Sequence, residues 1–432
     1  MNGLVEGFYG RPWPHERRLD VLARLADLGL DAYVYAPKDD DEHRARWRAP
    51  YDEAEASRLG ELARTAGARG VRFVYALAPG LDVRHADPAD LAALVAKLRQ
   101  ARDLGAQGLA LLFDDIPPRL HEDDQRRFGS LARAQAHLVL EAWRALGEPP
   151  LVVCPTEYCG DMTRGSTYLA ELGALLPQAI DLLWTGPHIV SETLTAAHAK
   201  EVAQVLGRKP LLWDNLFADD YDMRRLHLGP YAGREPALRD EVRGVLLNPG
   251  CAVELVDVAL QTFAAWRRGV TDPRTAWLAA LEAWRPLWTV GGAPLAHGDL
   301  VRFADAFYLP DRAGDTARAW WDDVAFLASH PPDAWGERAE RFLAAAGDLV
   351  AVCDRLAALD RRELLYAVYR HAWELKEELL LLDAWVRWRR DHPKEPLRHP
   401  NYRAPIYRGA LLTRLRSLLV QRPDGSLDAR AP

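Results

Sequence analysis

The adjacent residues Asp114 and Asp115 are the part of the sequence best suited to acid–base chemistry. They follow an apolar run, residues 109–113, that lies between Gly108 and Pro117. A short apolar run in this setting predicts a buried strand. In a cleft, like-charge repulsion and loss of water would raise the pKa of one carboxyl group, which then keeps a proton while its neighbour stays ionised. The alternative is a turn or an N-cap for the next helix, a common place for aspartate.

Short apolar segments alternate with helical patterns through roughly the first 260 residues. This alternation predicts an α/β fold, a (β/α)8 TIM barrel. An open doubly wound sheet is disfavoured because no Gly-x-Gly-x-x-Gly follows the first strand. The predicted strands are residues 3–9, 32–37, 71–78, 108–113, 151–155, 180–184, 210–213 and 244–249. The first four predicted helices are residues 15–28, 53–68, 88–104 and 124–145, and helices separate the later strands as well.

Polar and aromatic residues occur at the ends of nearly all the predicted strands. In a barrel of parallel strands, the C-terminal strand ends build the site. Aromatic rings can stack on sugar faces, and carboxylates and amides can bind hydroxyl groups, so the pattern indicates a sugar-binding site. The residues are Gly7, Tyr9, Lys38, Asp39, Asp114, Asp115, Glu157, Tyr158, Trp184, Thr185, Trp213, Asp214, Asn215 and Asn248.

The remainder of the chain has helical patterns rich in tryptophan and leucine. We therefore expect two domains, a catalytic barrel over residues 1–268 and an all-helical C-terminal domain over residues 269–432, with a long helix at 361–388 and a last one near 409–419. The tryptophans of this domain, Trp277, Trp284, Trp288, Trp320 and Trp321, are expected to fill its core.

Composition narrows the partners and the location. The net charge is −7 and no long Lys/Arg run occurs, so nucleic acid is not an expected partner. No apolar run approaches the ~20 residues that span a bilayer, so no membrane is expected. The start of the chain lacks the pattern of a signal peptide, and its four cysteines form no Cys-x-x-Cys pair or zinc-site spacing. We expect a cytoplasmic protein.

Nine stretches, in order along the barrel, together resemble one family. They are residues 3–13, 35–40, 47–48, 79–82, 112–116 (Leu-Phe-Asp-Asp-Ile), 154–159 (Cys-Pro-Thr-Glu-Tyr-Cys), 184–187, 213–215 with 219–222, and 229–231. The chain resembles glycoside hydrolase family 84, the retaining β-N-acetylglucosaminidases that include the nucleocytoplasmic protein O-GlcNAcases. His188 and Phe217 depart from the family pattern, where lysine and histidine are common, and we expect them to affect aglycone preference.

The resemblance implies catalysis assisted by the substrate. The 2-acetamido oxygen of the substrate attacks the anomeric carbon and forms an oxazoline. During this attack Asp114 orients and polarises the acetamido N–H, while Asp115 is the general acid and afterwards the general base. Because the nucleophile belongs to the substrate, the rule that relates carboxylate separation to stereochemistry does not apply. No metal and no cofactor is implied.

The resemblance also implies substrate-binding residues. The Gly7 backbone and Lys38 would hold ring hydroxyls, Tyr158 would bind the acetamido group, and Trp213 would wall the acetyl pocket. Asn215, Asp220 and Asn248 would bind the acetamido group or distal hydroxyls, with Tyr221 beside them. Structural alternatives are a solvated Lys38, a core Tyr158, a turn at Asn248, and caps at Asn215 and Asp220 for a helix near Asp222.

Two other functions fit parts of the sequence. A metal-dependent barrel hydrolase could use the carboxylates of residues 39–41 with Asp114 and Asp115, but the sequence has no His-x-His after the first strand, no His-Glu-x-x-His and no calcium-loop spacing. A non-catalytic sugar-binding module would not need both aspartates.

The expected partner is a substrate that carries N-acetylglucosamine, either a glycoprotein or another glycoconjugate. A homodimer through the helical domain is a further hypothesis. It rests on an aromatic and basic segment after the long helix, which contains Tyr402, Arg403, Tyr407 and Arg408.

Overall fold

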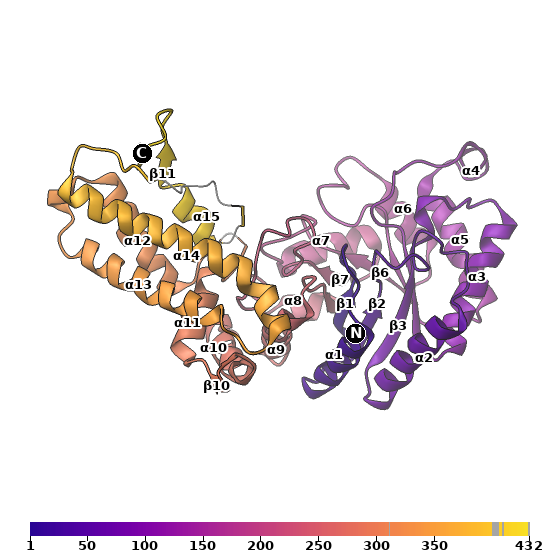
Figure 1. Cartoon of the computed structure of the whole chain (residues 1–432). Helices are drawn as coiled ribbons and strands as arrows, with labels where there is room; N and C mark the ends of the chain where they lie inside the picture. Colours follow the sequence, from indigo (N-terminus) through magenta and orange to yellow (C-terminus); the bar gives the residue numbers. More distant parts are fainter. Residues whose placement is uncertain (311, 400–405, 408–409, 431–432) are drawn as a thin grey trace. The chain divides into compact units, whose positions relative to one another are not determined.

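Eight parallel strands close into a barrel in the computed structural model of the chain, which describes residues 1–310, 312–399, 406–407 and 410–430 (Figure 1). The strands follow one another in sequence order, and β1 pairs with β8 to close the ring, with Asn2 opposite Val245. The strands are β1 (Asn2–Glu6), β2 (Ala32–Tyr35), β3 (Arg72–Leu77), β4 (Gly108–Leu112), β5 (Leu151–Cys154), β6 (Ile180–Trp184), β7 (Leu211–Asp214) and β8 (Gly244–Leu247). The predicted (β/α)8 barrel is therefore confirmed.

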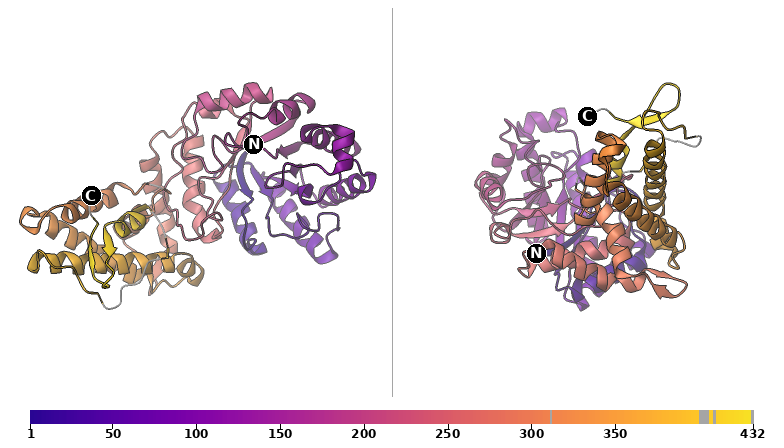
Figure 2. Two further views of the ribbon diagram at one scale, coloured as in Figure 1. Left: turned by 90° about the horizontal axis from the view of Figure 1, so that it is seen from above. Right: turned by 90° about the vertical axis from the view of Figure 1, so that its left-hand side faces the viewer.

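Helices cover the outside of the barrel (Figures 1 and 2). They are α1 (His15–Asp27), α2 (Glu53–Ala68), α3 (Pro88–Asp103), α4 (Glu122–Phe128), α5 (Leu131–Ala145), α6 (Tyr168–Leu175), α7 (Ala196–Leu206) and the single turn α8 (Leu238–Glu241), with a 3-10 turn at Pro79–Leu81. Every residue of the eight barrel strands is buried except for Asn2, Arg72 and Asp181, because helices pack on one face and barrel side chains on the other.

The single helix predicted over 124–145 is wrong, since two helices occupy this stretch. Gly129 adopts the left-handed conformation (φ 74°) that ends α4, and the Ser130 side chain accepts a hydrogen bond from the Arg133 N–H to start α5. A left-handed glycine followed by a serine cap is a strong break between helices.

The residues of the chain group into two units. The barrel unit comprises Met1–Asp220, Tyr231–Val253 and Trp266–Thr271, and the helical unit comprises Tyr221–Pro230, Glu254–Ala265 and Asp272–Pro432. Helix α9 (Val256–Arg267), preceded by a 3-10 turn at Val253–Leu255, begins among residues of the helical unit and ends among those of the barrel unit.

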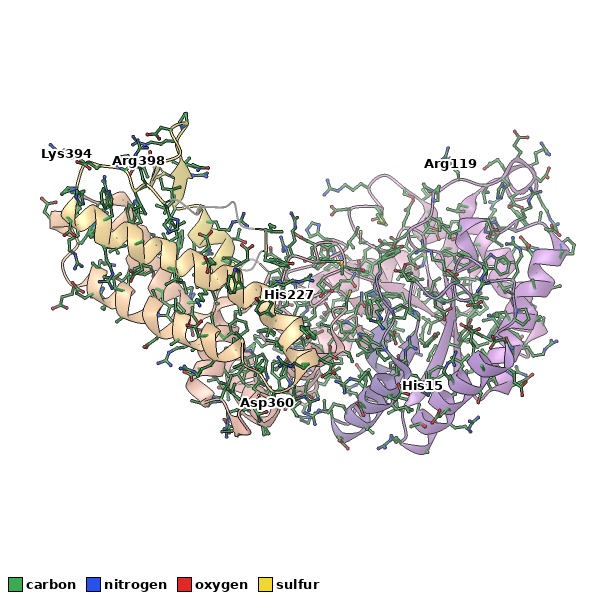
Figure 3. All side chains as sticks on the ribbon, in the orientation of Figure 1. His15, Arg119, His227, Asp360, Lys394 and Arg398 are labelled. Carbon is green, nitrogen blue, oxygen red and sulfur yellow. The ribbon has the colours of Figure 1, made fainter. Side chains whose placement is uncertain are left out.

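The helical unit continues with α10 (Pro273–Trp284), α11 (His297–Ala306), α12 (Asp315–Ser329), α13 (Arg338–Leu356), α14 (Arg362–Asp391) and α15 (Ala410–Arg416). The 3-10 turns are Arg285–Leu287 and Pro332–Ala334. Two small hairpins accompany these helices, β9 (Thr289–Val290) with β10 (Ala293–Pro294) and β11 (Leu419–Gln421) with β12 (Leu427–Ala429). Figure 3 shows the side chains of the described residues on the ribbon, with His227 and Asp360 among those labelled.

The tryptophans of the helical unit divide into two groups. Trp277, Trp284 and Trp288 are buried core residues, as predicted. The prediction is wrong for Trp320 and Trp321, which are half-buried on α12. Among the residues that the structure describes, no helix has the length and apolar character needed to cross a membrane.

Candidate active site

Alternate residues of each barrel strand point into the barrel, and this two-residue alternation identifies the residues that line the site at the strand ends. The buried interior includes Ala110 and Leu112 of β4 together with Val34 and Ala36 of the β2 row. Side chains alternate along a strand, so the next inward positions are 38 and 114. The rows from β7 and β8 lead in the same way to positions 213, 215 and 248. The C-terminal end of the barrel thus collects the predicted polar residues above an apolar interior.

Lys38 and Asp114 form a buried ion pair at this end. The ammonium group donates to Asp114 Oδ2, and the residues are 5% and 8% exposed. Burial alone would raise the pKa of Asp114, but the charge and hydrogen bond of Lys38 and the charge of Arg44 together lower it. The alternative of a solvated Lys38 is therefore wrong. The other oxygen, Asp114 Oδ1, is buried and has no hydrogen-bond partner among the described residues.

Asp115 lies beside this pair with a different set of contacts. The Tyr158 hydroxyl donates to its Oδ1 at 2.7 Å and the Tyr9 hydroxyl donates to its Oδ2 at 2.9 Å. Its backbone is left-handed, with φ 55°. This conformation interrupts the strand alternation, so that Asp115 need not point away from the face that Asp114 occupies. The alternative of a helix cap is wrong, because the next helix begins at Glu122 after His121.

Burial and Asp115 raise the pKa of Tyr158, which therefore stays a hydrogen-bond donor at neutral pH. Tyr158 is 6% exposed, which agrees with the alternative of a core tyrosine. Its hydroxyl group nevertheless donates a hydrogen bond to the Asp115 carboxylate. A buried ring that presents a polar tip to a carboxylate is suited to hold a substrate amide at the same place.

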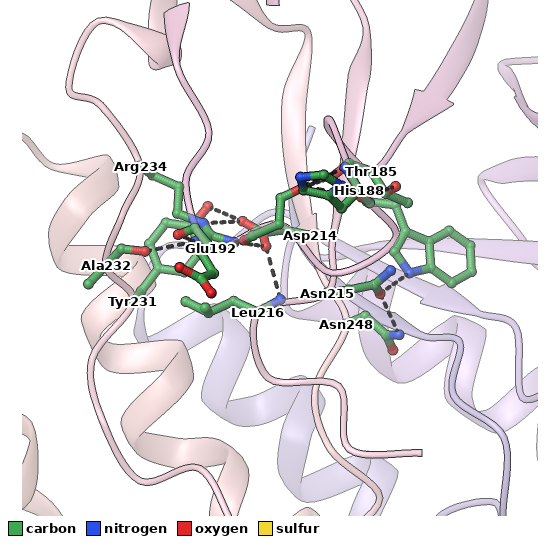
Figure 4. Close-up of polar contacts among 12 residues, drawn as sticks. Thr185, His188, Glu192, Asp214, Asn215, Leu216, Tyr231, Ala232, Arg234 and Asn248 are labelled. Atoms are coloured by element: carbon green, nitrogen blue, oxygen red, sulfur yellow. Dashed lines mark hydrogen bonds and ion pairs between the residues drawn. The ribbon is translucent and has the colours of Figure 1, made fainter. Parts of the chain in front are cut away.

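Trp213, Asn215 and Asn248 form a second polar cluster (Figure 4). Asn215 Oδ1 accepts from Trp213 Nε1 and from Asn248 Nδ2, both at 2.9 Å, and Asn215 Nδ2 donates to the Ile189 carbonyl at 2.8 Å. These bonds fix the orientation of the indole ring. Asn248 Oδ1 stays buried without a partner among the described residues, as Asp114 Oδ1 does. Unpaired buried acceptors are costly unless something else satisfies them.

Gly7 packs against the ring of Trp213. A Cβ atom at Gly7 would lie 2.2 Å from Trp213 Cζ2, far inside contact distance. The Lys38 ammonium lies 5.5 Å from the centre of the same ring. Glycine at this position therefore lets the indole ring lie against the backbone just after β1.

The carboxylate of Asp214, next to Trp213, has a structural role (Figure 4). It accepts from Arg234 Nε and from the Tyr231 hydroxyl, each at 2.8 Å, and from the Leu216 N–H at 3.1 Å. The Arg234 guanidinium also donates to the carbonyls of residues 191, 192 and 232. Asp214 is 1% exposed and fully bonded, so this network holds the loops after β6 and β7 rather than a ligand.

Asp220 and Tyr221 lie in different units. Asp220 belongs to the barrel unit and its Oδ2 accepts from the Tyr9 N–H at 2.8 Å. Tyr221 belongs to the helical unit, is 48% exposed and has its ring 5.7 Å from the Arg225 guanidinium. The alternative of helix caps at Asn215 and Asp220 is wrong, because no helix begins near Asp222 in the described chain. The substrate contact of Tyr221 stays a prediction.

Tyr9 and Arg44 are site residues that sequence reasoning missed. Tyr9 falls at the end of a predicted barrel strand, within the 3–13 motif, but its sequence position indicates no role. Arg44 stands in a charged segment after β2 that reads as a solvated loop, yet it is 9% exposed and donates to the Tyr9 hydroxyl. The described residues contain no cluster of three or more His, Cys, Asp or Glu side chains that could hold a metal ion.

A closed (β/α)8 barrel with two adjacent carboxylates, an indole ring and two asparagine amides at its C-terminal end has the features of a barrel enzyme that acts on sugars. A sequence model of the β-N-acetylglucosaminidase family matches residues 2–298. The chain therefore belongs to the β-N-acetylglucosaminidase family.

Curated relatives and solved structures agree with this assignment. The protein O-GlcNAcases of Rattus norvegicus and Mus musculus are each 43% identical over 269 residues, which is 61% of this chain and 29% of theirs. The chain thus spans less than a third of the length of these relatives. The structure of a mutant O-GlcNAc hydrolase from Thermobaculum terrenum matches with a TM-score of 0.81 and 29% identity, over 91% of this chain and 85% of that one. The structure titled CpGH84B matches with a TM-score of 0.77 and 26% identity, over 91% and 69%.

Proposed function

We propose that the protein hydrolyses terminal β-linked N-acetylglucosamine with retention of configuration, through an oxazoline formed by the substrate's own acetamido group. The observation that carries this proposal is the buried carboxylate of Asp114, the neighbour of Asp115. Its Oδ2 accepts a hydrogen bond from Lys38, and its Oδ1 has no partner among the described residues. An ionised carboxylate with one open acceptor suits an acetamido N–H, and it would stabilise the positive charge that develops there.

In the first step, the acetamido oxygen forms a bond to the anomeric carbon while the bond to the leaving oxygen breaks. Asp115, as the acid, gives its proton to the leaving oxygen. In the second step, Asp115 as carboxylate takes a proton from water, whose oxygen attacks the anomeric carbon and reopens the ring. Two inversions at one carbon give retention.

The polar cluster around the indole supports the same substrate. Trp213 would wall the pocket for the acetyl methyl group, and Asn248 Oδ1 offers an acceptor to a hydroxyl group. Lys38 has ammonium hydrogens beyond the one given to Asp114, so it can also hold a ring hydroxyl. Gly7 and Asp220 would complete the hydroxyl contacts. Asn215 would bind the acetamido group or a distal hydroxyl, and it also keeps the indole ring in place.

The decisive experiment is hydrolysis of an aryl β-N-acetylglucosaminide by the wild-type protein, Asp114→Asn and Asp115→Asn, with and without a chelator. We expect turnover that resists the chelator, because the ammonium of Lys38 already supplies a positive charge beside Asp114. Turnover should be lost in both variants, because each replaces a carboxylate that the mechanism needs. Loss on chelation would favour a metal-dependent hydrolase. Binding without turnover by the wild type would favour a sugar-binding module.

The natural substrate is proposed to be a glycoprotein that carries O-GlcNAc on serine or threonine, with terminal GlcNAc of other glycoconjugates as the alternative. The names of the Rattus norvegicus relative and of the similar Thermobaculum terrenum structure both refer to the hydrolysis of O-GlcNAc. Release of GlcNAc from an O-GlcNAc peptide, compared with chito-oligosaccharides at equal concentration, separates these substrates. Faster release from the oligosaccharides would reject the first choice.

The cytoplasm is the proposed location. All four cysteines are free thiols, which fits a reducing compartment. Fractionation of the source cells would test this assignment.

A homodimer through the helical unit is also proposed. Exposed aromatic rings on α14, those of Tyr366 and Trp373, could support it (72% and 50% exposed). Tyr402, Arg403 and Arg408, which suggested the dimer, lie outside the described residues, whereas Tyr407 is described and its ring lies 5.0 Å from His371. A monomer in light scattering would reject the dimer.

A further inference from the structure

We infer that Arg44 is a positioning residue for Asp115: it holds the left-handed backbone of Asp115 and directs the hydroxyl proton of Tyr9 toward the Asp115 carboxylate. This inference rests on the proposed function, because it concerns the group that acts as the acid there.

Arg44 contacts Asp115 by two routes. Its Nη2 donates to the Asp115 carbonyl at 3.2 Å, and its Nη1 donates to the Tyr9 hydroxyl, which in turn donates to Asp115 Oδ2 at 2.9 Å. The guanidinium carbon lies 5.2 Å from the centre of the Tyr9 ring. One planar side chain thus bridges the backbone and the carboxylate of the same residue, a geometry that the forked guanidinium allows.

The backbone of Asp115 needs such support. Among the described non-glycine residues, only Asp115 (φ 55°) and Glu148 (φ 57°) have a positive φ. A side chain with a Cβ occupies this region at a cost, and it persists only where neighbouring groups hold it. Arg44 binds the carbonyl group of Asp115 itself. The contact therefore helps to hold the backbone conformation of Asp115, which sets the direction of its carboxyl group.

The direction of the Tyr9 hydrogen bond follows from the donors. A hydroxyl group has one hydrogen, and the Arg44 nitrogen can only donate. Because the Tyr9 oxygen accepts from Arg44, its hydrogen is left for Asp115. Without Arg44 the hydroxyl group can rotate or accept from Asp115 when that residue is protonated.

The Tyr9 backbone is fixed independently. Its N–H donates to Asp220 Oδ2 at 2.8 Å, and the next N–H, that of Gly10, donates to Asp39 Oδ2 at 3.0 Å. Loss of the Arg44 side chain should therefore leave the Tyr9 hydroxyl group without a fixed orientation, while the backbone turn at Tyr9 and Gly10 stays in place. This separates a positioning role from a general role in folding.

Two variants distinguish geometry from charge. Arg44→Lys keeps the positive charge but cannot make both contacts at once, and Arg44→Met removes charge and contacts. Arg46, two positions away in the same segment, is the matched control, because it pairs with Glu42 and Asp41 at the surface and is 62% exposed in its side chain. Arg46→Lys and Arg46→Met should leave kcat/KM within about twofold of wild type, as surface ion pairs contribute little.

The measurement is kcat/KM for two substrates, 4-nitrophenyl and phenyl β-N-acetylglucosaminide. The phenyl leaving group needs protonation more, so a misplaced acid should slow it more. We expect Arg44→Lys to lower kcat/KM about tenfold or more for the phenyl substrate and about threefold or less for the nitrophenyl substrate, a part of the full contribution of a general acid. The thermal midpoint of Arg44→Lys should stay near that of Arg46→Lys.

Equal losses for the two substrates, or no loss in Arg44→Lys, would overturn the inference while the proposed function stands. A wild-type protein that cleaves neither substrate would overturn the proposed function and the inference together. If Arg44→Met does not fold, Arg44→Lys alone decides, since it retains the charge and most of the packing.

Discussion

The ends of β4 and β7 each carry a buried carboxylate paired with a cation, and the two pairs differ in one respect. Asp214 at β7 is saturated by Arg234, Tyr231 and a backbone N–H. Asp114 at β4 has Lys38 on one oxygen and no partner among the described residues on the other. Similar chemistry thus serves structure where every acceptor is filled, and offers a ligand site where one acceptor is open.

The largest effect is expected at the open pair. Asp114→Asn keeps the shape but removes the charge that stabilises the acetamido group, so kcat/KM should fall about 10²–10⁴-fold, as when a positioned catalytic group is lost. Steady-state hydrolysis of an aryl β-N-acetylglucosaminide gives the rate. The comparison breaks if Asp114→Asn retains more than about a tenth of the wild-type activity.

Asp214→Asn should act on stability instead. It leaves the guanidinium of Arg234 buried without its counter-charge, and loss of one partner of a buried pair costs about 3–5 kcal/mol. Urea unfolding followed by circular dichroism measures the change, with Asp114→Asn as the parallel sample. Equal stability of Asp214→Asn and the wild type would show that the saturated pair is dispensable.

Two buried histidines of the helical unit extend the comparison to pH. Burial lowers the pKa of His227 to about 3 and that of His371 to about 4, and both His227 nitrogens lack partners among the described residues. Unfolded histidine takes up a proton near pH 6.5, so the unfolded state binds more protons below that pH. Stability is therefore full above about pH 6.5 and falls toward pH 4, by about 1.4 kcal/mol per pH unit for each ring.

His227→Leu isolates one ring, because its pH slope should be smaller than that of wild type by that amount. Thermal unfolding at half-unit steps between pH 7 and pH 5 gives both slopes. Parallel curves for the variant and wild type would contradict the assignment.

The smallest effect sharpens the comparison within the saturated pair. Tyr231→Phe removes one donor from Asp214 and leaves Arg234 in place, so it should cost about 1 kcal/mol, the usual net contribution of a hydrogen bond. Its kcat/KM should match wild type. A loss of activity larger than the loss of stability would connect this network to the site.

The alternation of side chains between the two faces of a strand allows part of the site to be predicted from the sequence. Once β2 and β4 are identified, residues 38 and 114 fall on their inward faces, and the structure brings them into contact. The left-handed backbone of Asp115 could not be predicted, because its supporting groups, Tyr9, Arg44 and Tyr158, come from three other loops of the barrel. Local preference alone does not select that conformation for aspartate.

The prediction of a single helix over residues 124–145 is wrong for a different reason. The apolar spacing continues across Gly129 and Ser130, so the pattern favours one helix where backbone conformation and a cap make two. The resemblance of residues 219–222 to the family predicts substrate contacts for both Asp220 and Tyr221, but the units of the fold divide between these two residues. The domain boundary at residues 268 and 269 stays a prediction.

The pairing of β1 with β8 has a consequence for biosynthesis. Asn2, at the start of the chain, finds its partner Val245 only after about 240 further residues have been made. At about 5–20 residues per second, the first strand waits roughly 10 to 50 s on the ribosome with one edge unpaired. A nascent chain of this protein thus carries an open sheet edge until β8 has been made, and a chaperone that covers strand edges would find its longest-lived target in the barrel there.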